Sequence, residues 1–91
     1  MSRKDEWRKI LDSELRRWSA LSWEELVARL HDIQCYEVKI DAKAYQVEVE
    51  LLENTDTYVH VMVAVDDGTL PASMMPLSET FIREKRPSSG S

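Results

Sequence analysis

The chain has 91 residues, the length of one domain, and its 43 % hydrophobic and 32 % charged residues are typical of a globular protein rather than a disordered one. The formal net charge of −5 disfavours nucleic acid and anionic membrane surfaces as partners, because both carry negative charge. The single cysteine, Cys35, cannot form an internal disulfide, and the charged residues 1–10 lack the apolar region of a signal sequence. We therefore expect a cytoplasmic protein with no nucleic-acid partner, no membrane partner and no cofactor.

Two amphipathic helices are predicted before residue 31. In residues 5–18, apolar residues recur at three- and four-residue steps and align as one stripe of a helix. A second, shorter helix is predicted to begin after Ser22, which is a typical N-cap and has Glu25 three residues on as its capping-box partner. The three tryptophans share the spacing of these stripes, which favours a place in the core over an aromatic ligand-binding cage.

From residue 35 the apolar period changes from 3.6 to 2, which indicates strands. Residues 35–40, 44–53 and 57–65 alternate apolar and polar side chains, with short turns at 41–43 and 54–56. They predict an antiparallel meander with the helices on one face, so the fold class is α+β in the order α-α-β-β-β. The predicted inward face consists of Trp7, Ile10, Leu11, Leu15, Trp18, Leu26, Leu30, Val38, Val47, Val49, Val61 and Val63.

The C-terminal segment is predicted to be irregular, because Pro71 and Pro76 interrupt any regular strand between them. A short edge strand over residues 73–75 would make the sheet four-stranded. Ser78 is expected to open one helical turn that places residues 81–82 on the core. We expect a single domain over residues 1–86 and a disordered tail over residues 87–91.

One candidate chemical site depends on how the strands pair. If Ile40 lies opposite Tyr45, and Leu51 opposite Val59, then Cys35, Glu50 and His60 form a row across three strands on the outward face. A thiol, a carboxylate and an imidazole in contact are suited to zinc binding or to a cysteine nucleophile, which would make the protein a small enzyme or a metal-binding protein. The simpler interpretation is a cross-strand polar pair of Glu50 with His60, and Cys35 as a small filler. No glycine-rich phosphate loop or common catalytic motif occurs.

The outward face of the third strand gives the favoured hypothesis. Tyr58, Met62 and Ala64 share this face with His60, so it is more apolar than the solvated face of an antiparallel sheet usually is. Such a face could be covered by a second copy of the chain, by another protein, or by the segment containing Met74 and Met75. We expect a non-enzymatic protein-interaction module that self-associates through an interface comprising Tyr58, His60, Met62, Met74 and Met75.

A first prediction concerns nucleic acid. We expect no specific binding to duplex RNA or DNA at physiological salt, because the chain is acidic and its clearest basic feature is the Arg16–Arg17 pair. A gel-shift titration checks this, and binding in the micromolar range would contradict it.

Overall fold

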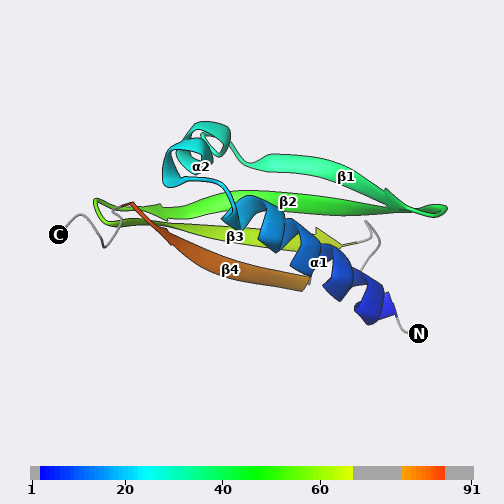
Figure 1. Ribbon diagram of the computed structural model, residues 1–91. Helices are drawn as coiled ribbons and strands as arrows, with labels where there is room; N and C mark the ends of the chain where they lie inside the picture. Colours follow the sequence, from blue (N-terminus) through cyan, green and yellow to red (C-terminus); the bar gives the residue numbers. More distant parts are fainter. Residues whose placement is uncertain (1–2, 67–76, 86–91) are drawn as a thin grey trace.

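Residues 3–66 and 77–85 are described in the computed structural model. Helices α1 (Arg3–Ser19) and α2 (Trp23–Arg29) precede strands β1 (Gln34–Ile40), β2 (Lys43–Asn54), β3 (Tyr58–Asp66) and β4 (Leu77–Glu84). The strands form a four-stranded antiparallel sheet in the order β1-β2-β3-β4, and both helices lie against the same face of it (Figure 1). The predicted α+β fold, with its helices on one face of an antiparallel meander, is confirmed.

Both helices form over the predicted stretches, and α2 begins at the predicted cap. Ser22 caps α2: its hydroxyl accepts a hydrogen bond from the Glu25 backbone N–H at 3.2 Å, and the Glu25 carboxylate accepts one from the Ser22 N–H at 3.5 Å. Helix α1 lies across β3 and β4, whereas α2 covers β2 and β3 nearer the other end of the sheet. No helix in the described ranges is long and apolar enough to cross a membrane.

The core lies between the helical layer and the sheet. Alternation along β3 turns Val59, Val61, Val63 and Val65 towards the helices, and all four are fully buried. Every residue of the predicted inward face is buried except Leu15 and Val38, which are partly buried and pack against the same cluster. The predicted orientation of each element is therefore correct.

Strand β4 corrects the expectation of an irregular C-terminal segment. The helical turn predicted from Ser78 is wrong, because residues 77–84 pair with β3 along its length. Thr80, Phe81 and Ile82 favour extended backbone, and pairing with β3 satisfies their backbone groups in a way that an isolated helical turn does not. Phe81 packs against the core as expected, whereas Ile82 points the other way and is 59 % exposed. The predicted strand at 73–75, Met74, Met75 and the tail 87–91 lie outside the described residues.

The pairing of neighbouring strands also differs from the prediction. Ile40 lies opposite Lys43 rather than Tyr45, because the first turn contains only Asp41 and Ala42. Asp41 has φ 56°, a left-handed conformation that aspartate adopts more readily than most residues. Between β2 and β3, Leu51 lies opposite Val61 rather than Val59, and an irregularity follows before Glu53 pairs with His60.

The burial of β3 yields a stability prediction. Val61→Asp should unfold the domain or nearly so, because an unpaired buried carboxylate costs several kcal/mol of a total stability of about 5–10 kcal/mol. Thr80→Asp is the matched control, since Thr80 is exposed on the opposite face of the sheet. Thermal unfolding followed by circular dichroism checks both. A Val61→Asp protein that melts within a few degrees of wild type would contradict the assigned faces.

Candidate functional site

The sheet has an outer face, which we define as the side opposite the helices. Residues that lie opposite one another on neighbouring strands share a face. Because the buried valines of β3 face the helices, the pairing shows which residues of every strand belong to the outer face. The outer face consists of Cys35, Glu37, Lys39, Ala44, Gln46, Glu48, Glu50, Glu53, Tyr58, His60, Met62, Ala64, Asp66, Ser78, Thr80, Ile82 and Glu84.

The predicted row of Cys35, Glu50 and His60 does not form. All three lie on the outer face, but Cys35 is opposite Glu48, Glu50 is opposite Met62, and His60 is opposite Glu53. The pairing on which the row depended is therefore wrong. No group of three or more His, Cys, Asp and Glu side chains in the described part of the chain is arranged to hold a metal ion.

His60 belongs to a different polar cluster from the predicted one. Its Nδ1 lies 3.5 Å from Oε1 of Glu53, and the Tyr58 hydroxyl donates a hydrogen bond to the same oxygen at 3.1 Å. That hydrogen bond is the main cause that raises the pKa of Tyr58. The irregularity after Leu51 brings Glu53 opposite His60, so a local feature of β2 selects the partner of the histidine.

Apolar side chains lie beside this cluster. Met62 is half-buried on the outer face, and Ile82, opposite His60, is 59 % exposed. Leu52, at the irregularity in β2, is 42 % exposed. We call Met62 of β3 and Ile82 of β4 the apolar stripe of the outer face, and Leu52 of β2 lies on the neighbouring strand. Ala64, which the sequence placed on the same face, is buried.

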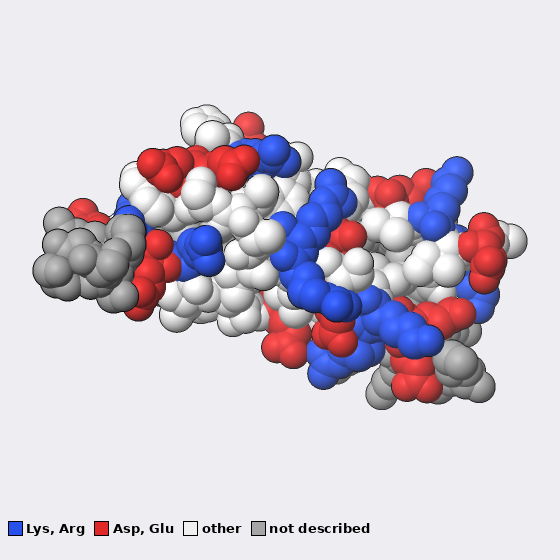
Figure 2. Space-filling model, in the orientation of Figure 1, with Lys and Arg blue, Asp and Glu red and all other residues white. Residues whose placement is uncertain are grey.

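Charge is distributed unequally between the two sides of the molecule. The described outer face has the carboxylates of Glu37, Glu48, Glu50, Glu53, Asp66 and Glu84 and the single cation Lys39, a net charge of −5 with His60 neutral. This equals the formal net charge of the whole chain. On the helix side, basic and acidic side chains are interspersed (Figure 2). The outer face is therefore the strongly acidic side of the described molecule.

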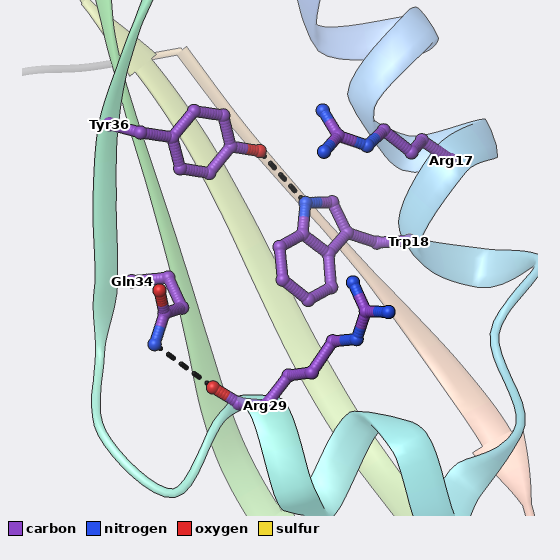
Figure 3. Close-up of a pocket in the computed structure, with 5 residues that line it drawn as sticks. All are labelled: Arg17, Trp18, Arg29, Gln34 and Tyr36. Carbon is purple, nitrogen blue, oxygen red and sulfur yellow. Dashed lines mark hydrogen bonds between the residues drawn. The ribbon is translucent and has the colours of Figure 1, made fainter.

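A second feature lies on the helix side. A cavity of about 390 Å³ is formed where the C-terminal ends of α1 and α2 approach the start of β1, and its lining includes two arginines (Figure 3). The lining residues are Arg17, Trp18, Arg29, Gln34 and Tyr36.

Hydrogen bonds fix the floor of this cavity. The Trp18 indole N–H donates to the Tyr36 hydroxyl at 2.8 Å, and that hydroxyl donates to the carboxylate of Glu14. Glu14 is only 7 % exposed, and its carboxylate lies 3.6 Å from the Arg17 guanidinium. Burial, aided by the bond to Glu14, raises the pKa of Tyr36 to about 12. The chain of contacts connects the end of α1 to β1.

Sequence reasoning missed this cavity. Arg17 and Arg29 each lie in the last turn of a helix, where a basic side chain is favourable beside the terminal carbonyl groups, so neither is unusual by itself. The signal that was present is that both predicted helices have arginine near their C-terminal ends and that a strand begins shortly after the second. Only the packing of the helices on the sheet brings the two guanidinium groups to one cavity.

The chain matches no protein-family model, no curated protein and no solved structure in the comparisons made. Each functional role proposed below therefore depends on the contacts and charges of its own residues.

Tyr36 yields a prediction about pH. Tyr36→Phe should destabilise the protein by about 1–3 kcal/mol at neutral pH, because the buried Glu14 carboxylate and the Trp18 indole each lose a partner. The folded protein holds the Tyr36 proton until about pH 12, whereas the ordinary value is 10.0. The free energy of unfolding that depends on the protonated Tyr36 hydroxyl is therefore fully present below pH 10 and is lost as the pH rises towards 12.

Urea unfolding of wild type and Tyr36→Phe at pH values on both sides of 10 measures this effect. The difference in unfolding free energy between the two proteins should shrink as the pH rises through this range. A difference that stays constant would show that Tyr36 titrates in the same way in the folded and unfolded chains.

Proposed function

We propose that this domain is a non-enzymatic protein-interaction module that binds its partner through the outer face. The observation that carries the proposal is the apolar stripe over β3 and β4, in which Ile82 is 59 % exposed. Helices cover the other face of the same sheet, so the core does not need the stripe for its own burial. An exposed apolar stripe with a polar rim is typical of a protein-binding surface.

Charge favours a particular class of partner. Two copies of the outer face brought together would place like charges of −5 against one another, which opposes the self-association expected from the sequence. A protein segment that alternates apolar and basic side chains would match both the stripe and the carboxylates around it. The preferred partner is therefore a basic protein rather than a second copy.

The competing proposal of a small enzyme or metal site has less support. It requires Cys35, Glu50 and His60 in contact, and strand pairing separates them along the sheet. His60 instead has Glu53 and Tyr58 beside it, a polar cluster that suits an interface and requires no catalysis. A cytoplasmic location is part of the proposal, because the exposed thiol of Cys35 is compatible with a reducing compartment.

A matched pair of variants tests the outer face. Ile82→Asp removes the most exposed apolar side chain of the stripe, and Ile33→Asp is its control, since Ile33 is 50 % exposed in the connection between α2 and β1. The probe is a synthetic peptide of alternating lysine and valine, with a glutamate–valine peptide as the charge control. We expect the lysine peptide to shift backbone amide signals of β3 and β4 in a titration followed by nuclear magnetic resonance.

Ile82→Asp should weaken this binding about tenfold, the loss expected for one well-placed apolar contact, while Ile33→Asp leaves it unchanged. His60→Gln should weaken it by less, since it keeps a polar side chain at the position. Shifts spread evenly over the helix side, or equal binding by both variants, would contradict the proposal.

Light scattering of the wild-type protein shows whether the partner is a second copy of the chain or a different protein. A monomer at all concentrations supports a different protein as the partner. A dimer that Ile82→Asp dissociates and Ile33→Asp does not would keep the surface but replace the basic partner with a second copy.

A further inference from the structure

We propose that the cavity between α1, α2 and β1 binds the carboxylate of a small organic acid between Arg17 and Arg29. This site lies on the helix side of the sheet and is independent of the outer face. The two guanidinium groups come from different helices and approach the Trp18–Tyr36 pair from opposite sides (Figure 3). Guanidinium groups are suited to carboxylates because their N–H groups match the two oxygens.

Both arginines keep donors that a ligand can use. The Arg17 guanidinium lies 3.6 Å from Glu14, and the Arg29 guanidinium lies 3.9 Å from Glu25. Both separations exceed the 2.7–2.9 Å that is typical of a charge-assisted hydrogen bond. Each arginine is therefore held near the cavity by electrostatic attraction while most of its N–H groups remain open to another acceptor.

The charge of the site favours a negatively charged ligand. Arg17 and Arg29 give the lining two positive charges, and their acidic partners Glu14 and Glu25 are not among the residues that line the cavity. A carboxylate is attracted to both guanidinium groups, and the aromatic rings beside them favour an organic acid over inorganic phosphate. The structure thus offers a local positive site in a chain whose formal net charge is −5.

The remaining walls suit an organic body. The rings of Trp18 and Tyr36 line the cavity, and their hydrogen bond holds them in place (Figure 3). The volume of about 390 Å³ is far larger than a bare ion needs and lies within the range of small-molecule sites. A planar acid would place its carboxylate between the arginines and its ring against the aromatic wall.

The Trp18 indole N–H is a specific reporter for the test, because it already donates to Tyr36 on the cavity floor. The ¹⁵N-labelled full chain is titrated with benzoate, and uncharged benzamide, which has the same ring, is the ligand control. We expect benzoate to shift the Trp18 indole signal in a saturable way and benzamide to leave it unchanged. N-acetylphenylalanine forms a third arm: if it binds tenfold tighter than benzoate, the natural ligand is a peptide C-terminus, and otherwise it is a free acid.

Variants distinguish the binding of benzoate at this cavity from its non-specific attraction to exposed arginines. Arg17→Gln and Arg29→Gln should each raise the dissociation constant for benzoate at least tenfold, as expected for the loss of a charge-assisted hydrogen bond. Arg16→Gln is the matched control, because Arg16 is exposed beside Arg17 and does not line the cavity. Thermal unfolding confirms that each variant is folded. Equal responses to benzoate and benzamide, no shift at Trp18, or equal weakening by Arg16→Gln and Arg29→Gln would overturn the proposal.

Discussion

The row of fully buried valines on β3 is the contact on which the rest of the fold depends. Val59, Val61, Val63 and Val65 lie on a strand with paired neighbours on both sides, and both helices pack over it. Because side chains alternate along a strand, burying this row forces the intervening residues to the other side of the sheet. The position of His60 and the apolar character of the outer face are therefore consequences of how the core is packed.

Alternation also explains which features could be predicted from the sequence. The predicted pairing of β1 with β2 differs from the observed pairing by two residues, since Cys35 lies opposite Glu48 and not Glu50. A shift of two residues leaves every side chain on its own face, so the core was correct although the site was wrong. The contacts of Cys35 and His60 depend on turn length and on the irregularity after Leu51, and hydrophobic periodicity does not report either of them.

Strand β4 was harder to predict for a different reason. An edge strand has a neighbour on one side only, and Ser78, Glu79 and Glu84 are polar enough to suit a turn or a helix as well. Its conformation is decided by long-range pairing with β3, which local sequence does not encode. The cavity at Arg17 and Arg29 has the same origin, because helix packing rather than spacing in the chain brings them together.

The connection from Trp18 through Tyr36 to Glu14 has a consequence for motion. The helices pack mainly on β2, β3 and β4. Strand β1 is held by its ladder with β2, by the packing of Tyr36 and Val38, by the Tyr36 hydroxyl, and by the Gln34 side chain, which donates to the Arg29 carbonyl at 3.0 Å. An edge element with few tertiary attachments belongs to the low-stability end of local unfolding, and its amide hydrogens exchange with solvent before those of the central strands. Since Gln34 and Tyr36 of β1 line the cavity, local unfolding of β1 would remove one wall of the cavity while the buried valines of β3 stay on a strand paired with β2 and β4. Because the Arg17 and Arg29 side chains are 66 % and 56 % exposed, loosening of β1 would change the shape of the aromatic wall rather than open a path to the arginines.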